Sequence, residues 1–504
     1  MDDPSTMSAT ELTRALRRRD VSSREVLTHY LKRVHTDHGA INAVVTLDEE
    51  NAQLQALAAD EALVRGGPVG PLCGLPMTIK DSIETAGLRT TSGAPQYTGH
   101  IPDRDADVVA RLRAAGAVIF GKTNVPPLAM DFQTANPLFG VTNNPWDTTR
   151  TPGGSSGGSA AALAAGHTGF ELGGDLAGSI RIPAANCGVN GLRPSQGVVS
   201  TRGHIPKQPG SLDQPDLVVL GPMGRAADDL ALGLDVLAAP SPRDAVGWQL
   251  HLPRPRAASL HGYRLVTVLD DLYGDVATEV IDVLRSTIDS LRAAGATIEE
   301  VALPVSLAES DALFQQCVAG FVADTQPEHV MDFYRAVAAG ADADDPSPVT
   351  QWARWSTQSV GEWHLARERR AQLKHRWAAF FQDHDAVLCP ASLVAPLPHH
   401  PNPDPNQRTF LVNGDPRPWF AQSLWSAPAT LADLPAATTP AGLTATGLPI
   451  GIQVIGPYLE DRTVVDVAQH IEALIGRLAP PSRANATPHG IEPTATSGAR
   501  GVSP

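Results

Sequence analysis

An amphipathic helix that stops at a glycine and leads at once into a short apolar strand occurs twice in this 504-residue chain. Residues 105–121 hold the first copy, with Gly116 as a left-handed cap between helix and strand. Residues 275–301 repeat the pattern, with Gly295 as the stop. Helices that alternate with buried strands are typical of α/β proteins, so the chain predicts an α/β fold. The two units are candidates for the halves of one mixed sheet.

The composition is that of an ordinary globular protein. Hydrophobic residues make up 42% of the chain and charged residues 18%, and the net charge is −15. An acidic chain is a poor general partner for nucleic acid or anionic membranes, so neither is expected. The start of the chain has no leader-like pattern and no stretch reaches about 18 apolar residues, which favours the cytoplasm. The four cysteines form no C-x-x-C pair, so no metal site is predicted.

A lysine closes an apolar, strand-like stretch. Residues 74–81 read GLPMTIKD, and Lys80 stands at the end of the apolar run. Burial disfavours the charged form of a lysine and lowers its pKa, which suits a general base. The alternative is a surface lysine paired with Asp81 or Glu84, and for Lys80 taken alone that alternative is the stronger one.

A glycine-rich stretch around Ser155 precedes a helical segment. Residues 151–159 read TPGGSSGGS, and the helix resumes from Ala160. The stretch matches the G-x-S-x-G nucleophile elbow, yet residues 147–152 are turn-like where an elbow needs a strand. A Gly/Ser turn that leads into a helix N-terminus is a site for an anion or an oxyanion. The alternative is a flexible Gly/Ser linker.

A second serine follows a run of small residues. Residues 173–183 read GGDLAGSIRIP and place Ser179 in a position where successive backbone N–H groups can point into a common space. The alternative is a tight turn closed by an ion pair of Asp175 with Arg181. A serine hydroxyl needs a base before it attacks a carbonyl. Lys80 and the two serines together therefore predict a hydrolytic site that needs neither histidine nor metal.

These stretches resemble the amidase signature family. The further matching segments are GKTNVP (121–126), NPLFG (136–140), NPWD (144–147), GLRP (191–194) and GLPIGIQ (447–453). The resemblance covers most of residues 8–478 and is weakest over about 240–430. It implies a single large α/β/α domain with a central mixed sheet flanked by helices, and an enzyme that uses no cofactor.

The resemblance also implies a role for each site residue. Ser179 is the nucleophile, Ser155 is the bridging serine after a cis peptide bond, and Lys80 is the base. The residues expected to support this trio are Ser156 in the hydrogen-bond chain and Asp175 and Arg181 in the loop.

A group of backbone positions is expected to bind the substrate. The N–H groups of Leu176, Ala177, Gly178 and Ser179 would hold the oxyanion, and the backbone near Ala129 would line the pocket opposite the nucleophile. The family usually has glycine where Ala177 stands. Alanine would be strained if that position needs a positive φ, so we expect a slightly reshaped oxyanion site that is still active.

The chain divides into five regions in this interpretation. Residues 1–66 form a helical region that packs on the core, and residues 67–240 form the catalytic core. Residues 241–430 are the variable, substrate-facing region, and residues 431–478 complete the core. Residues 479–504 are rich in Pro, Ser, Ala, Thr and Gly and are expected to be disordered.

The expected substrate is a small-molecule amide or carbamate, with anilides and urethanes among the candidates, and the expected assembly is a monomer or homodimer. Three other classes stay open. One is the A subunit of an amidotransferase, which works in a complex on charged tRNA. Another is a non-catalytic binding protein on the same scaffold. The last is an α/β-hydrolase that uses Ser155 and a histidine.

Overall fold

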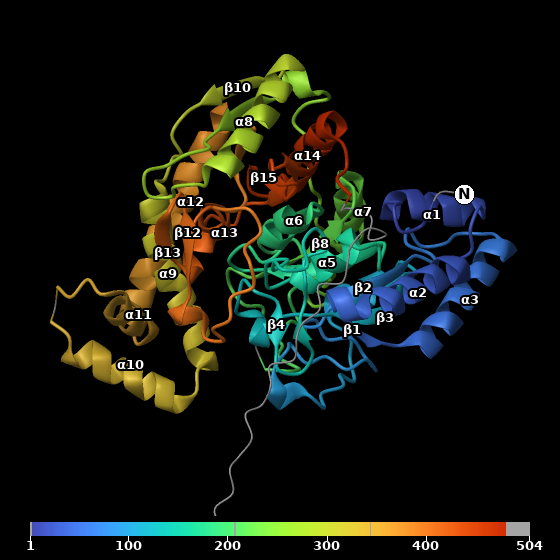
Figure 1. Cartoon of the computed structure of the whole chain (residues 1–504), viewed down its shortest axis with the longest axis horizontal. Helices are drawn as coiled ribbons and strands as arrows, with labels where there is room; N and C mark the ends of the chain where they lie inside the picture. Colours follow the sequence, from blue (N-terminus) through green and yellow to red (C-terminus); the bar gives the residue numbers. More distant parts are fainter. Residues whose placement is uncertain (1–2, 206–207, 343, 480–504) are drawn as a thin grey trace, which may run out of the picture.

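The computed structural model describes residues 3–205, 208–342 and 344–479 (Figure 1). Its α-helices are α1 (Ala9–Arg18), α2 (Ser23–Ile41), α3 (Glu49–Arg65), α4 (Asp107–Ala114), α5 (Gly157–Ala164), α6 (Arg181–Cys187), α7 (Ala227–Leu237), α8 (Thr278–Ala293), α9 (Leu307–Val322), α10 (Glu328–Gly340), α11 (Pro348–Ser356), α12 (Val360–Asp383), α13 (Ala427–Leu431) and α14 (Asp461–Ile475). Its strands are β1 (Val44–Leu47), β2 (Pro76–Lys80), β3 (Val118–Thr123), β4 (Ala135–Asn136), β5 (Gly140–Val141), β6 (Phe170–Asp175), β7 (Asn190–Arg193), β8 (Val219–Gly224), β9 (Arg264–Thr267), β10 (Thr297–Glu300), β11 (Ala386–Pro390), β12 (Thr409–Val412), β13 (Asp415–Pro418), β14 (Ala436–Leu443) and β15 (Pro449–Ile455). Residues 480–504 of the tail expected to be disordered lie outside the described residues.

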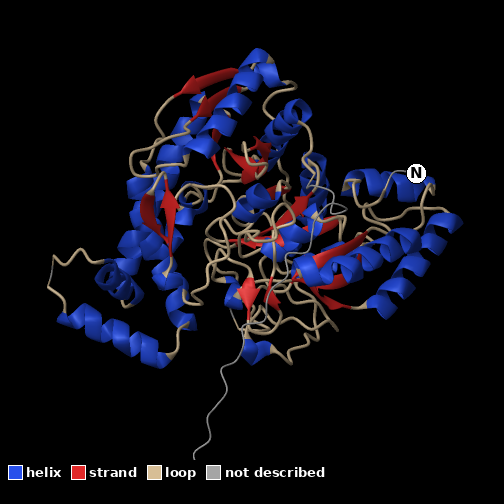
Figure 2. Ribbon diagram, viewed as in Figure 1, coloured by secondary structure: helices blue, strands red, loops and turns tan. Residues whose placement is uncertain are grey.

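A mixed sheet forms the centre of the fold. Its eight strands follow the order β10-β9-β11-β15-β14-β7-β8-β6. The strands β10, β9 and β11 are parallel, whereas the remaining neighbours pair antiparallel. A separate three-stranded sheet has the order β1-β3-β2, with β2 and β3 parallel. Helices flank the sheets (Figure 2), which confirms the predicted α/β fold with a central mixed sheet.

The two helix–strand units predicted from the sequence exist but do not share a sheet. The first unit is α4 followed by β3, and the second is α8 followed by β10. Strand β3 pairs with β1 and β2 in the small sheet, while β10 pairs with β9 at the edge of the large sheet. The prediction that these two units are halves of one mixed sheet was wrong. Local sequence predicts that a strand forms, but it does not determine which other strand it pairs with.

The N-terminal part of the chain is helical, as predicted. Helices α1 and α2 each begin with a capping box, formed by Ser8 with Glu11 and by Ser22 with Glu25. Helix α3 ends at Gly66. Strand β1, between α2 and α3, was not predicted. These helices lie beside the small sheet that carries Lys80 (Figure 1).

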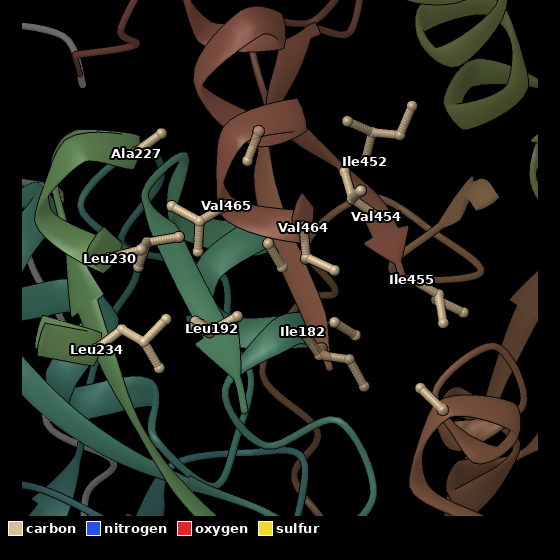
Figure 3. Close-up of a cluster of buried hydrophobic side chains, with 14 of the residues drawn as sticks. Ile182, Leu192, Ala227, Leu230, Leu234, Ile452, Val454, Ile455, Val464 and Val465 are labelled. Atoms are coloured by element: carbon tan, nitrogen blue, oxygen red, sulfur yellow. The ribbon is translucent and has the colours of Figure 1, made fainter. Parts of the chain in front are cut away.

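A buried apolar cluster anchors α6, the helix that follows Ser179 (Figure 3). Ile182 of α6 is fully buried in this cluster. The side chains gathered there come from β7, α7, β15 and α14: Leu192, Ala227, Leu230, Leu234, Ile452, Val454, Ile455, Val464 and Val465. Burying one such aliphatic side chain contributes about 1.5–3 kcal/mol, so the packing fixes the start of α6 against the large sheet.

The variable region contains a group of helices and a hairpin that was not predicted. Residues 305–385 hold α9 to α12, and α10 and α11 extend away from the body of the molecule (Figure 1). The segment 391–414 contains β12, which pairs with β13. Pro416 and Pro418 lie in β13. Both strands of a two-stranded sheet are edge strands, where prolines are tolerated.

Within the described ranges, no helix is both long and apolar enough to cross a membrane. All four cysteines are buried and free.

Candidate active site

The three residues of the predicted trio lie at the ends of regular elements. Lys80 is the last residue of β2, which is buried along its whole length. Ser155 lies just before α5, and Ser179 lies in the loop that joins β6 to α6. Ends of strands and starts of helices bring side chains and free N–H groups to one edge of an α/β sheet, where ligands typically bind.

Lys80 contacts two of the three serines of the glycine-rich stretch. Its Nζ donates to Ser155 Oγ at 2.7 Å, to Ser156 Oγ at 2.9 Å and to the Gly174 carbonyl at 3.3 Å. The side chain is fully buried. The structure therefore brings Lys80, Ser155 and Ser156 together as the resemblance implies.

The surface-lysine alternative for Lys80 does not hold. Asp81 is buried and accepts hydrogen bonds from the N–H and hydroxyl of Thr91 at 3.1 and 2.5 Å. Glu84 Oε1 lies 3.0 Å from Nε2 of His100. Both carboxylates thus have other partners than Lys80.

Burial shifts the protonation of Lys80. Loss of solvent lowers the pKa of its amine from 10.5 to about 7, and the negative charges of Asp175 and Glu171 oppose this decrease. About half of the lysine side chains are then neutral at pH 7. A neutral amine can accept a proton, so Lys80 has the protonation state that a general base needs.

The two serine loops are joined through their backbones. The peptide bond between Gly154 and Ser155 is cis. The N–H of Ser156 donates to the Ser179 carbonyl at 3.1 Å, and Ser156 Oγ lies 3.3 Å from the Gly174 carbonyl. Ser156 therefore links Lys80, strand β6 and the loop that carries Ser179.

The Ser179 side chain is largely buried but does not contact Ser155. The residue is 8% exposed, and within the described part of the chain its hydroxyl has no hydrogen-bond partner. The expected Ser155–Ser179 contact is therefore not closed in this structure. Catalytic hydrogen bonds are often long without substrate and shorten in the substrate complex.

Three of the four predicted oxyanion donors are unused. The N–H groups of Leu176, Ala177 and Ser179 donate to no protein group among the described residues, whereas the Gly178 N–H donates to the Asp175 carboxylate at 3.0 Å. Backbone N–H groups in folded proteins almost always have partners. The unpaired N–H groups mark a place where an oxyanion can bind, and the structure shows that Gly178 already serves another acceptor.

The expected strain at Ala177 does not arise. The positive φ of this loop belongs to Gly178, at +101°, and Ala177 is not among the residues with positive φ. A Cβ on Gly178 would lie 2.3 Å from Ser426 Oγ and 2.9 Å from Ile182 Cδ1. Glycine is thus required at position 178, and alanine fits at 177.

Asp175 organises the loop that carries Ser179. Its carboxylate accepts hydrogen bonds from the N–H of Ile180 at 3.0 Å and from Arg181 Nε and Nη2 at 3.0 and 2.8 Å. Burial works against the charged carboxylate, but the guanidinium groups of Arg181 and Arg193 keep the Asp175 pKa well below its usual value. All three side chains are fully shielded from solvent, so the loop is fixed by a buried cluster of opposite charges.

Sequence reasoning missed several residues of this cluster. Arg181 Nη1 also donates to the Ser426 carbonyl at 3.0 Å and to Gln453 Oε1 at 2.7 Å, and Thr430 accepts from Nη2. These partners lie more than 240 residues further along the chain. No local pattern identifies them, although Gln453 lies within the quoted segment 447–453.

Two buried titratable groups near Lys80 were also missed. Glu171 of β6 accepts a hydrogen bond from Thr78 of β2, and burial raises its pKa to about 7. His204 Nε2 lies 3.1 Å from Ser82 Oγ, and burial together with the Lys80 charge lowers its pKa to about 3. Within the described ranges no histidine bonds to Ser155, so the pairing that an α/β-hydrolase needs is not formed.

The predicted pocket wall has an unusual backbone. Leu128 and Ala129 have φ angles of +53° and +57°. Two consecutive left-handed residues that are not glycine cost of order 1–3 kcal/mol each and occur mainly at functional sites. The N–H of Leu128 donates to the Ser92 carbonyl at 2.8 Å, and Ala129 is half-buried.

No group of three or more metal-binding side chains exists in the part of the chain that the structure covers.

Comparison with known proteins places this geometry in context. A family profile described as Amidase matches residues 25–465. The A subunit of the glutamyl-tRNA(Gln) amidotransferase of Geobacillus thermodenitrificans (strain NG80-2) is 34% identical over 485 residues, which cover 92% of this chain and 96% of the relative.

Solved structures are similar along nearly the whole chain. One comes from a vestigial protein complex described as revealing the evolutionary origins of an s-triazine catabolic enzyme; its TM-score is 0.78 at 28% identity, and the match covers 94% of this chain and 100% of that chain. Another is the crystal structure of an amidase, with a TM-score of 0.74 at 29% identity and coverage of 93% and 100%.

Proposed function

Since this chain belongs to the amidase signature family and is a hydrolase that acts on amide C–N bonds, we propose that it cleaves small-molecule amides through an acyl-enzyme on Ser179. Anilides and carbamates are included among the proposed substrates. Ser155 relays the proton, Lys80 is the base, and the enzyme works without a cofactor as a monomer or homodimer. The supporting observation is the 2.7 Å contact between Lys80 Nζ and Ser155 Oγ at a fully buried lysine.

The proposed first half-reaction forms the acyl-enzyme. Neutral Lys80 accepts the Ser155 proton while Ser155 takes the proton of Ser179, and the Ser179 oxygen bonds to the substrate carbonyl carbon. The electron pair that moves onto the carbonyl oxygen is held by the N–H groups of Leu176, Ala177 and Ser179. Losing one such donor typically costs about 3 kcal/mol in the barrier.

The first half-reaction is completed when the C–N bond breaks. The leaving nitrogen takes the proton of Ser155, Lys80 returns a proton to Ser155, and the acyl group stays on Ser179. The second half-reaction regenerates the enzyme. Water then attacks the ester on Ser179 with the same relay, which releases the acid and restores the hydroxyl. Protons and electrons balance without any other reactant.

A hydrolysis panel tests the proposal. The purified chain is assayed with p-nitroanilides, primary amides and aryl carbamates, with Ser179→Ala as the blank. Ser290→Ala is the matched control, because Ser290 lies on α8 and its hydroxyl donates to the Ser286 carbonyl of the same helix. We expect release of amine by the wild type and by Ser290→Ala but not by Ser179→Ala. Equal activity of Ser179→Ala and wild type would contradict the proposal.

A second candidate is an amidotransferase A subunit that works in a complex. The 34% identity to a protein of that kind over 92% of the chain favours it. This function predicts that the isolated chain hydrolyses anilides poorly and gains amidase activity only with partner subunits. Efficient hydrolysis of simple anilides by the chain alone would count against it.

A further inference from the structure

A buried ion pair joins the segment next to the pocket wall to the unpredicted hairpin β12–β13. Asp131 Oδ2 accepts from Arg408 Nη1 at 2.7 Å, and Asp131 Oδ1 accepts from Trp419 Nε1 at 2.7 Å. The side chains of Arg408 and Asp131 are only 3% and 11% exposed. The Arg408 guanidinium also lies over the Trp419 ring, 5.2 Å from its centroid. The carboxylate thus holds two side chains from the two ends of the hairpin.

The residues that follow Asp131 repeat this connection. Gln133 exchanges two hydrogen bonds with the backbone of His400, at 3.2 and 2.7 Å. The rings of Phe132 and Phe420 pack edge to face with centroids 6.1 Å apart. Residues 131, 132 and 133 therefore all contact the segment 400–420. Because three consecutive residues make such contacts, the whole segment 131–133 is fixed in place.

The backbone of Asp131 lies against the glycine-rich stretch that carries Ser155. A Cβ on Gly154, the residue before Ser155, would lie 2.4 Å from the Asp131 carbonyl oxygen. Two and three residues earlier in the chain stand Ala129 and Leu128 with their left-handed φ angles. Any shift of the Asp131 backbone is therefore passed to the cis serine and to the pocket wall.

We propose that Asp131 is a positioning residue that sets the distance between the Leu128–Ala129 wall and Ser155, and so selects substrates by the size of the acyl group. The proposal rests on the proposed amidase function and on the family resemblance that places Ala129 opposite the nucleophile. A buried ion pair adds little to the free energy of unfolding, because desolvation offsets much of its attraction. Its charge-assisted hydrogen bonds nevertheless hold the two side chains in a defined geometry. Arg408 is held in turn by the carbonyls of Asn402 and Pro403, at 2.6 and 3.0 Å, so the pair has one orientation.

The test compares two isosteric variants on substrates of graded size. Asp131→Asn removes the charge that holds Arg408. Asp385→Asn is the matched control, because Asp385 is also buried and pairs with Arg264 and Arg256 at 2.8 and 3.1 Å, outside the contacts that surround Ser155 and Ser179. Each variant is assayed with p-nitroanilides from acetyl to bulky aryl acyl groups, and kcat and KM are separated.

We expect Asp131→Asn to change the ratio of kcat/KM for small acyl groups to kcat/KM for bulky acyl groups by about 10- to 100-fold, mainly through KM. Asp385→Asn should keep the wild-type order of substrates. Arg408→Gln should give the same new order, and the double variant should add little to either single change. A uniform loss over all substrates by Asp131→Asn would overturn the proposal.

A second measurement does not depend on activity. Hydrogen exchange of peptides that cover residues 126–134 should become faster in Asp131→Asn and stay unchanged in Asp385→Asn. Unchanged exchange in both variants would overturn the positioning role. Failure of the proposed function has a different signature, because then the wild type would hydrolyse no amide or Ser179→Ala would remain active.

Discussion

The pH dependence of hydrolysis follows from the burial of Lys80. An amine with its ordinary pKa of 10.5 is neutral in only about 0.03% of molecules at pH 7, whereas a pKa of about 7 makes about half of them neutral. Burial therefore increases the fraction of competent enzyme by about a thousandfold. Between pH 6 and pH 8 the neutral fraction rises from about a tenth to about nine tenths. We expect kcat/KM to increase about tenfold over that interval.

The assay is kcat/KM of a neutral anilide from pH 5.5 to 9.5, since this ratio reports the free enzyme. The other titratable groups around Lys80 are Asp175, held ionised by Arg181, and Glu171, Lys122 and His204. The His204 pKa of about 3 lies below the range. The Lys122 amine donates to Ile83, Thr85 and Thr90, and burial lowers its pKa to about 8. A profile that is flat, or one whose midpoint stays near 10, would refute the assignment of Lys80 as a neutral base.

Three further variants extend this reasoning. Glu171→Gln removes a negative charge that opposes deprotonation of Lys80, so the acid limb of kcat/KM should move to lower pH by at least ~0.5 unit; an unmoved limb would show that Glu171 is neutral in the active enzyme. Lys80→Met should be inactive, and its free energy of unfolding should not increase with pH as that of the wild type does. Because the folded pKa of Lys80 is below its unfolded value, the wild-type free energy of unfolding should increase from about pH 7 to about pH 10.5, by at most ~5 kcal/mol. Denaturant titrations that find the same pH dependence in both proteins would contradict this. Gly178→Ala should lose at least ~1–2 kcal/mol of stability and about 100-fold in kcat/KM, because its Cβ meets Ser426 at a positive φ, while Ala177→Gly should stay within about threefold of wild-type activity; equal effects of the two changes would show that the loop adapts.

The sequence was sufficient for the elements that depend on local pattern. The apolar run that ends at Lys80 predicted a strand, and the structure has this strand as β2. The burial of Lys80 itself could not be decided from the run, because for the lysine taken alone the surface alternative was the stronger one. The glycine stop after α4, at Gly116, could be predicted because the chemistry that ends a helix lies within a few residues.

The features that local pattern could not provide depend on distant contacts. The partners of Arg181 at Ser426 and Gln453, and the pair of Asp131 with Arg408, join positions more than 240 residues apart. A buried charge is stable only when all of its partners are in place. The order of residues in the chain does not tell which of the many arginines and carboxylates become partners.

The loop that carries Ser179 shows a finer limit of prediction from sequence. A run of small residues predicts a tight turn with exposed N–H groups, but it does not say which residue takes the positive φ. That choice decides both why Ala177 is tolerated and why Gly178 donates to Asp175 instead of remaining free. The division of the chain into five regions and its cellular location stay predictions.

Direct identification of the acylated residue tests the central claim that Ser179 is the nucleophile. The enzyme is mixed with p-nitrophenyl acetate, quenched in acid during turnover, and digested with trypsin. Cleavage after Arg150 and Arg181 leaves both serines on one peptide, residues 151–181, so fragmentation of that peptide must locate the acetyl group. We predict a single acetyl group on Ser179, lost in Ser179→Ala; an acetyl group on Ser155 would contradict the account.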